Sequence, residues 1–297
     1  MVIELQNKQM DNRILRIIPA QRVNMGGNWI EQPLPAQGID RIGPFLLIHH
    51  WQDVLPGGQS PLEVGVGPHP HRGFSPVTCI YAGSLRHRDS LGTDHIVTAG
   101  GTQWMNSGSG IVHSERPSDE LAENGGLLEM IQFWINTPRA HKMDPPHYQP
   151  LSAEETPTWK DGEWEIGLVQ GEWNEHRSPI AAAHSMRILN LRCETVASTV
   201  RVPIPPDWVG VAYVLDGKAH INGLPVEGRQ MAVIQPGSAK EPDIAFECND
   251  AVRILLLTGA PLDEPVFSHG PFVMNSIEEV QHAIMDYHDG KMGSLHE

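Results

Sequence analysis

The chain has 297 residues, of which 40% are hydrophobic and 6% aromatic, and its formal net charge is −15 at pH 7. This excess of acidic side chains opposes binding to nucleic acid, so we expect no direct nucleic-acid partner. No apolar run approaches the roughly 20 residues that a membrane helix needs, and the first residues lack the pattern of a signal peptide. We therefore expect a cytoplasmic protein without a membrane partner.

The length predicts two domains of about 150 residues each. The three cysteines, Cys79, Cys193 and Cys248, are far apart in the sequence and odd in number. This argues against a disulfide framework and fits a reducing compartment. Apolar or strand-like neighbours predict that the thiols are buried and inert.

Residues 13–135 consist of short strand-like runs separated by turn residues. Runs such as 45–48, 77–81 and 130–135 are rich in apolar residues, and glycine-containing turn signals lie between them. No convincing amphipathic helix occurs in this part of the chain. The pattern predicts an all-β barrel or sandwich.

The stretch 138–162 differs in composition, because it holds five prolines among many polar residues. It makes a poor strand and a poor helix, and we interpret it as a linker along the surface. The rhythm of short strands returns from 163 to 258. Near the end, Ser276 is a plausible N-cap with Glu279 three residues later, which predicts a short C-terminal helix.

The two halves of the chain show a weak internal repeat, because segment 80–85 resembles segment 214–219. It predicts two similar β-barrels. The expected division is an N-terminal metal-binding barrel over 1–137, a linker over 138–162, and a C-terminal barrel without metal ligands over 163–297.

Two residue pairs with i,i+2 spacing form the candidate metal site. His69 and His71 are one pair, and His113 and Glu115 repeat the spacing 42 residues after His71. Side chains at i and i+2 of a β-strand point to the same face, so each pair can reach one ion. Two such strands facing each other across a barrel would supply three imidazoles and one carboxylate, a set that suits Fe, Mn, Ni, Cu or Zn.

Only the first barrel keeps this pattern. The two repeat segments share a glycine, at positions 83 and 217. Counting back the same number of residues from each places His69 and His71 opposite Pro203 and Pro205. We therefore expect a single metal ion, in the N-terminal barrel.

The run from His69 to Glu115 resembles the pirin family of the cupin superfamily, and the resemblance extends over nearly the whole chain. The matching segments are 68–74, 87–92, 103–105, 108–115, 132–136 and 270–275. The resemblance implies two tandem cupin (jelly-roll-like) β-barrels with one divalent metal ion, most often iron, in the first. It places the metal ligands on His69, His71, His113 and Glu115.

The resemblance implies two unlike functions. One is a metal-dependent dioxygenase that uses dioxygen on a flavonol-like (quercetin-type) or other enolic or phenolic small molecule. The alternative is a non-enzymatic metal- or redox-dependent regulatory protein that acts through protein partners. The sequence alone does not decide whether the chain is an enzyme, nor whether it is a monomer or a dimer.

One position departs from the family pattern. Pirins commonly carry a glutamate four residues after the second histidine, and this chain has Ser75 there, followed by Pro76. A serine cannot take a proton from a flavonol hydroxyl without a base of its own. Glu115 could serve as the base only if it leaves the metal during turnover.

The remaining histidines and the large apolar residues nearby have weaker claims to the site. His49 and His50 are adjacent and cannot chelate together from a strand, and His87 lies in a polar run that predicts a solvated side chain. Three residues are expected to be core or pocket wall: Phe74, Trp104 and Met105. Seven histidines are expected to be exposed: His141, His147, His176, His184, His282, His288 and His296.

Overall fold

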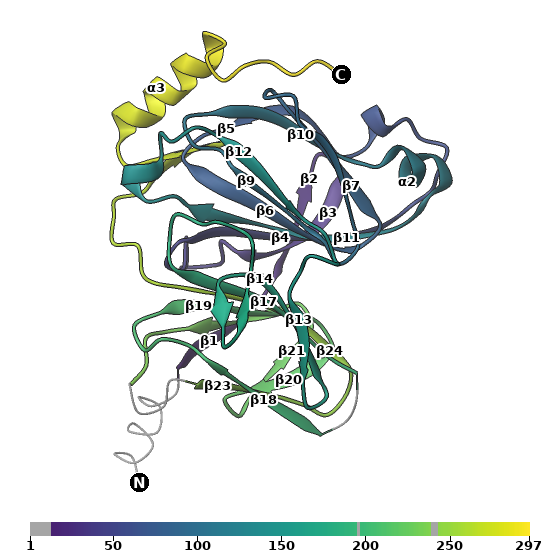
Figure 1. Ribbon diagram of the computed structural model, residues 1–297, viewed down its shortest axis with the longest axis vertical. Coiled ribbons are helices and arrows are strands. Elements are labelled where there is room, and N and C mark those ends of the chain that lie inside the picture. The colour runs from purple at the N-terminus through teal and green to yellow at the C-terminus, as the bar shows by residue number, and fades with distance from the viewer. Residues whose placement is uncertain (1–12, 195–196, 239–242) are drawn as a thin grey trace. The chain divides into compact units, whose positions relative to one another are not determined.

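The structure is a computed structural model that describes residues 13–194, 197–238 and 243–297 (Figure 1). Most of its regular elements are β-strands, which confirms the predicted all-β class. Within the described residues two α-helices lie among them, α2 (Asp119–Asn124) and α3 (Ile277–His288). Neither these nor any other helix in the described ranges has the length and apolar character needed to cross a membrane.

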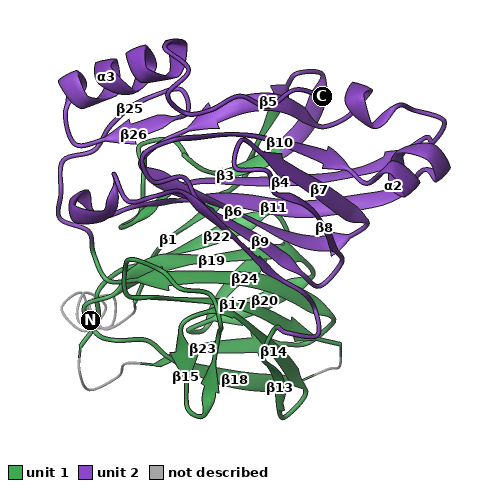
Figure 2. Ribbon diagram, turned by 45° about the horizontal axis from the view of Figure 1, so that its top comes forward, with its two compact units in different colours: residues 1–23, 31–45, 156–261 green, residues 24–30, 46–155, 262–297 purple. Residues whose placement is uncertain are grey.

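The contacts divide the chain into two compact units, each assembled from segments that are distant in sequence (Figure 2). Unit 1 comprises the described parts of 1–23, 31–45 and 156–261, and unit 2 those of 24–30, 46–155 and 262–297. Each unit is a group of residues that have more contacts with one another than with the rest of the chain. The contiguous domains 1–137 and 163–297 with their linker remain a prediction.

Unit 2 contains an antiparallel sheet with the strand order β12-β9-β6-β11-β4. Its strands are β12 (His147–Leu151), β9 (Thr102–Asn106), β6 (Phe74–Ala82), β11 (Gly126–Asn136) and β4 (Phe45–Leu55). Strands β3 (Asn28–Leu34) and β2 (Gln21–Met25) each have residues in both units. Strand β6 is buried along most of its length, which explains its run of apolar and small residues.

A second sheet of unit 2 has the order β5-β10-β7-β8. Its strands are β5 (Val66–His71), β10 (Ile111–Pro117), β7 (Ser84–Asp89) and β8 (Asp94–Thr98). The smaller elements of the unit are η1 (Pro61–Glu63), η2 (Arg139–His141), β25 (Phe267–His269) and β26 (Phe272–Met274). The predicted metal ligands all lie on β5 and β10.

Unit 1 contains a seven-stranded sheet and a four-stranded sheet of orders β1-β22-β19-β24-β17-β14-β13 and β18-β23-β20-β21. The first is built from β1 (Ile14–Pro19), β22 (Gln230–Ile234), β19 (Val209–Asp216), β24 (Val252–Gly259), β17 (Met186–Cys193), β14 (Trp164–Gln170) and β13 (Thr158–Asp161). The second is built from β18 (Ser198–Pro203), β23 (Asp243–Cys248), β20 (Lys218–Ile221) and β21 (Leu224–Glu227). A short hairpin adds β15 (Glu172–Trp173) and β16 (His176–Arg177).

Alternate residues of these strands form one apolar core, in which Trp164, Leu189 and Phe246 are fully buried. Cys193 and Cys248 belong to this core, and their Sγ atoms lie 2.7 Å apart although 55 residues separate them. Burial raises the pKa of the Cys248 thiol to about 11. Cys79 is buried as well, so the prediction of buried thiols is confirmed, and a protonated thiol is a poor nucleophile.

The expectation that 138–162 contains no strand is wrong, because β12 and β13 lie within it. Both are at the end of their sheets, next to β9 and β14 respectively. An edge strand leaves one row of backbone N–H groups unpaired, so Pro150 in β12 costs no ladder hydrogen bond. Sequence reasoning misread prolines that are compatible with an edge strand.

The predicted C-terminal helix is confirmed as α3. The Ser276 side chain accepts a hydrogen bond from the Glu279 backbone N–H, as the N-cap pattern predicts. Arg72, next to a predicted metal ligand, donates to Asp286 of this helix over 2.9 Å. Farther on, the Ser90 hydroxyl donates to the Met292 carbonyl over 2.9 Å. These two hydrogen bonds hold the C-terminal segment against the rest of unit 2.

Candidate metal centre

The two pairs of predicted ligands lie on neighbouring strands. Strands β5 and β10 are antiparallel, with His113 opposite His69 and Ile111 opposite His71. The expectation that the ligand strands face each other across a barrel is therefore wrong, because they are hydrogen-bonded partners in one sheet. Cross-strand partners on the same face have Cβ atoms only about 5 Å apart, which brings the imidazoles together directly.

Three imidazoles form a compact triad: His69, His71 and His113. Their candidate ligand nitrogens all lie within 4.8 Å of one another. The ring centroids are 4.3 Å apart for His69 and His113, and 4.8 Å apart for His71 and His113. His69 Nε2 and His71 Nε2 are separated by 3.1 Å. This triad could hold a metal ion.

The hydrogen bonds of the triad fit a metal site. His69 Nδ1 donates to the Gly67 carbonyl over 2.8 Å, which leaves the lone pair of Nε2 facing the other rings. His113 Nε2 is buried and has no hydrogen-bond partner within the described part of the chain. A buried polar atom without a partner is costly, and ligation of a metal would satisfy this nitrogen.

The burial of two of these rings keeps them neutral. Burial holds the pKa of His71 and of His113 well below the usual value of 6.5, and the neighbouring His69 lowers both further. A neutral imidazole is the form that binds metals. His69 is only partly buried, so the triad is closest to solvent on its side.

Glu115 lies beside the triad but is not grouped with it. The Gln103 side-chain amide donates to Glu115 Oε1, and the Gln132 amide donates to Oε2 over 2.7 Å. The Thr78 hydroxyl donates to Oε1 over 3.2 Å. Three donors therefore hold the carboxylate, so its role as a fourth ligand remains a prediction.

The strand register contributes to this placement. Between His113 and Glu115 the pairing with β5 shifts, so that Glu115 lies opposite Val66. On the other side of β10 the pairing stays regular, with Glu115 opposite His87. The extra residue is therefore on β5, in a bulge that contains Gly67, and the i,i+2 spacing alone could not reveal it.

Ser75, at the position where pirins commonly have glutamate, is buried and donates its hydroxyl hydrogen bond to Asn106 Oδ1. Its hydroxyl is thus already committed to a neutral amide, which cannot act as a base. The structure gives no basic partner that would activate Ser75 among the described contacts.

The three apolar candidates belong to the core. Phe74, Trp104 and Met105 are each at most 2% exposed. The Phe74 ring packs edge-on against His71, with centroids 4.9 Å apart, and Trp134 lies 5.5 Å from the same histidine. Phe74 therefore supports a triad histidine from behind.

Sequence reasoning missed His87, which it expected to be solvated. His87 is fully buried on β7, and its Nδ1 lies 3.4 Å from Nδ1 of His113. Its Nε2 lies 2.9 Å from Asp89 Oδ2. The spacing of His87 and Asp89 is again i,i+2, so the alternation that revealed the ligand pairs could have revealed this pair too. The flanking arginines obscured it.

The other histidines lie away from the triad. His50 is buried and its Nε2 lies 3.1 Å from Glu129 Oε1. Five of the seven histidines expected to be exposed are confirmed as such, and His176 and His184 are half-buried. The five are His141, His147, His282, His288 and His296.

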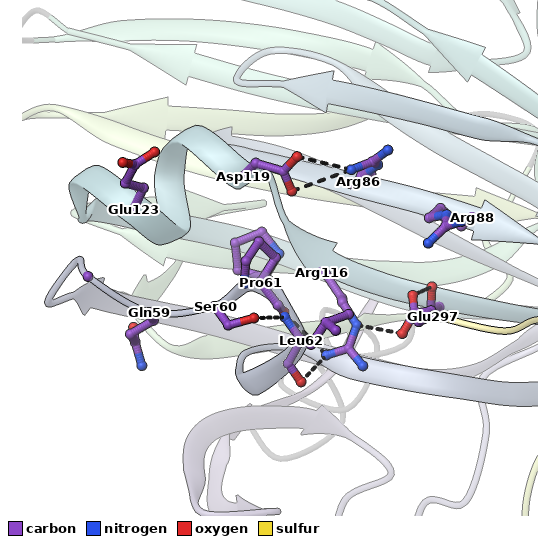
Figure 3. A pocket seen from close by; sticks show the side chains of 13 residues that line it. Gln59, Ser60, Pro61, Leu62, Arg86, Arg88, Arg116, Asp119, Glu123 and Glu297 are labelled. Atoms are coloured by element: carbon purple, nitrogen blue, oxygen red, sulfur yellow. Dashed lines mark hydrogen bonds and ion pairs between the residues drawn. The ribbon is translucent and has the colours of Figure 1, made fainter.

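The outward side chains of β7 and β10 contribute to the lining of a cavity of about 710 Å³ (Figure 3). Arg86, Arg88 and Arg116 contribute to it. The Glu297 carboxylate accepts hydrogen bonds from Ser114 and, over 2.8 Å, from Arg116 Nε. Strand β10 thus presents His113 of the triad on one face and binds the C-terminal Glu297 through Ser114 and Arg116 on the other.

Two family models match the chain. The pirin model matches residues 28–135, and the model of the pirin C-terminal cupin domain matches residues 188–293. The first range contains His69, His71 and His113. The matched ranges cover both halves of the chain.

Individual relatives agree with the family models. A Pseudomonas aeruginosa protein provisionally named quercetin 2,3-dioxygenase is 32% identical over 284 residues, covering 92% of this chain and 97% of the relative. Mouse pirin is 31% identical, with coverage of 94% and 93%. The crystal structure of quercetin 2,3-dioxygenase from Acinetobacter baumannii superimposes with a TM-score of 0.87 at 29% identity, covering 96% of this chain and 99% of the other.

Proposed function

Because the chain belongs to the pirin family of bicupin proteins, we propose that it is a metal-dependent dioxygenase. The proposed substrates are dioxygen and a flavonol-like molecule of the quercetin type, or another enolic or phenolic small molecule. The observation that carries the proposal is the compact triad of imidazoles, two of which are buried. The names of two relatives, from Pseudomonas and Acinetobacter, support the substrate class.

The proposed cofactor is one divalent metal ion, with His69, His71 and His113 as ligands and Glu115 as the fourth. Iron is the first expectation, and Ni, Cu, Mn and Zn also suit three nitrogens and one carboxylate. When bound, such an ion supplies a Lewis acid that favours the deprotonated form of a substrate hydroxyl. We propose that substrate approaches from the side of His69, the most exposed triad member.

The protein must also provide a group that accepts the hydroxyl proton, and we propose Glu115 for this role. Ser75 cannot serve, because its hydroxyl is bonded to the Asn106 amide. Gln103, Gln132 and Thr78 donate to the oxygens of Glu115, and these hydrogen bonds would hold the carboxylate whenever it is not a ligand of the ion. These donors would hold the carboxylate in position while it accepts the proton.

Turnover of quercetin tests the proposed activity. Iron-loaded protein is expected to consume quercetin and dioxygen together in aerobic buffer, measured by absorbance and an oxygen electrode. The His69→Ala variant is expected to lose this activity, because it removes one of three imidazoles. The exposed His282 on α3 provides a control, and His282→Ala should retain full activity. Equal rates for wild type and His69→Ala would refute quercetinase chemistry.

The Gln103→Leu variant tests whether Glu115 leaves the metal. Gln103 is 4% exposed, and its amide donates to Glu115. A hydrogen bond to a charged group contributes about 1.5–3 kcal/mol, so kcat is expected to fall about 10- to 100-fold. The metal content, measured by elemental analysis, should not change. An unaltered kcat at full metal loading would show that Glu115 does not use this site during turnover.

Ser75 also favours a second candidate function, a metal- or redox-dependent binding protein that acts through protein partners. A chain without the usual glutamate could keep its metal and lose the chemistry. A pull-down with ferrous and with ferric protein tests this function. Identical partners in the two states would contradict redox control.

A further inference from the structure

We propose that His87 and Asp89 are positioning residues that fix the tautomer and orientation of His113, and thereby set the affinity of the triad for metal. The inference rests on the metal site proposed above and does not require the dioxygenase reaction. It assigns a role to a buried polar pair that the proposed reaction does not use.

Strand register places this pair behind the triad. Strand β7 pairs with β10 so that Asp89 is opposite His113 and His87 is opposite Glu115. His87 and Asp89 therefore share the face of β7 that is turned toward the metal ligands. Both side chains have no exposed surface, whereas Arg86 is partly exposed on the opposite face. The environment of the pair is dry, so its hydrogen bonds are not replaced by water.

The hydrogen bonds run in one direction. Asp89 Oδ1 accepts the backbone N–H groups of Leu91 over 2.9 Å and Thr93 over 3.1 Å, and Oδ2 lies 2.9 Å from His87 Nε2. A carboxylate can only accept, so His87 carries its proton on Nε2. Its Nδ1 then has a lone pair, which accepts the Nδ1–H of His113 over 3.4 Å.

This arrangement leaves His113 with only one possible role for its other nitrogen. With Nδ1 protonated, the lone pair of a neutral ring is on Nε2. That atom is the buried nitrogen without a partner among the described residues, in a ring whose centroid is 4.3 Å from that of His69. A ring nitrogen bonded to an outer partner, which is itself held by a carboxylate, is the usual way in which proteins orient a metal-binding histidine.

Stacking restrains the His87 ring as well. The Tyr148 ring of β12 lies parallel to it, with centroids 4.1 Å apart and planes inclined by 14°. The ring therefore cannot rotate freely about its bond to the strand. The His50 and Glu129 pair offers a comparison, because it is also a buried histidine and carboxylate in unit 2 but lies on β4 and β11.

The hydrogen bonds from Asp89 through His87 to His113 form a relay. The Asp89→Asn substitution tests this relay without changing the shape of the side chain. The asparagine oxygen can keep the two backbone N–H groups, which turns its amide N–H₂ toward His87 Nε2. His87 must then accept there and carry its proton on Nδ1, opposite the Nδ1–H of His113. Two donors facing each other should weaken the binding of Zn²⁺ about 10- to 100-fold, as loss of an outer partner does elsewhere. Competition with a chromophoric chelator measures this affinity.

The matched control is Glu129→Gln, which makes the same change at the His50 pair and should leave zinc affinity unaltered. If each carboxylate had only a structural role, Asp89→Asn and Glu129→Gln would both lower the stability of the protein, and neither would change its zinc affinity. Equal zinc affinity of Asp89→Asn and wild type would overturn the proposal.

Nitrogen-15 NMR of the zinc-loaded wild type decides the matter even if Asp89→Asn does not fold. The expected spectrum shows His113 protonated at Nδ1, and His87 protonated at Nε2 only. A proton on His87 Nδ1 would overturn the relay. A wild type that binds no zinc, iron or nickel would overturn both the metal site and the relay. Zinc binding with the expected tautomers but without quercetin turnover would support the relay and refute only the dioxygenase.

Discussion

Replacement of His113 by alanine is expected to abolish useful metal binding. Each triad ring contacts the other two, and His113 in addition has its Nδ1 3.4 Å from Nδ1 of His87. The variant loses a predicted ligand, and with it the contact to His87 that orients this ligand. We therefore expect a larger loss of affinity than the about 10- to 100-fold that removal of an outer partner causes. Isothermal titration with Zn²⁺ measures it.

The His113→Ala variant should still fold, because the substitution removes a buried neutral ring and leaves no buried charge without a partner. The His282→Ala variant is again the control, since His282 is an exposed histidine on α3. Wild-type affinity in the His113→Ala variant would show that the metal binds elsewhere. Metal removed from the wild type by a chelator should produce the same loss of quercetin turnover as this variant.

Replacement of Lys142 by methionine is expected to lower the free energy of unfolding by about 3 kcal/mol or more. The Lys142 ammonium is 1% exposed, and it donates to the Gly73 carbonyl over 2.6 Å, to Asn136 Oδ1 over 2.7 Å and to the Val273 carbonyl over 2.9 Å. Methionine fills similar space but donates nothing. Each buried acceptor left without a partner costs about 1–3 kcal/mol, whereas the Gly73 carbonyl keeps one donor, the Thr137 backbone N–H. Urea unfolding measures the difference.

The same pair of proteins should respond differently to pH. Burial lowers the pKa of Lys142 to about 8 from its usual 10.5. Between these values the unfolded chain holds a proton that the folded chain has lost, so stability due to this group rises with pH. The stability difference between wild type and Lys142→Met is thus expected to grow from pH 8 toward 10.5. A constant difference would contradict the lowered pKa.

The exposed Lys291 offers a matched control. Its ammonium binds Asp286 and Asp289 at the surface of the molecule, where an ion pair contributes about 1 kcal/mol or less. Lys291→Met should therefore change stability little. A similar loss in both variants would mean that removal of a positive charge, and not of the three buried hydrogen bonds, is responsible.

The sequence alone was enough to identify the β-class, the C-terminal helix and the triad histidines. These features depend on short-range patterns, because i,i+2 spacing fixes which side chains share a strand face and an N-cap needs only its own helix. The motifs on which the family resemblance rested lie inside the ranges matched by the pirin models, apart from Asn136 at the end of one motif.

Only the tertiary structure decided which strands are neighbours, and three corrections follow from that. Strand β5 pairs directly with β10, a bulge on β5 alters the position opposite Glu115, and prolines are accommodated because β12 is an edge strand. No local pattern contains this information, since strand pairing and register are set by packing across the whole sheet.

The metal site shows the same division between sequence and structure. The spacing of His69, His71 and His113 determined that three imidazoles could meet. The fold decided that Glu115 is held by glutamine amides, and that His87, which sequence reasoning placed in solvent, lies buried against His113. The physical reason is that a ligand pair is a local property of one strand, whereas the partners that orient it come from neighbouring strands.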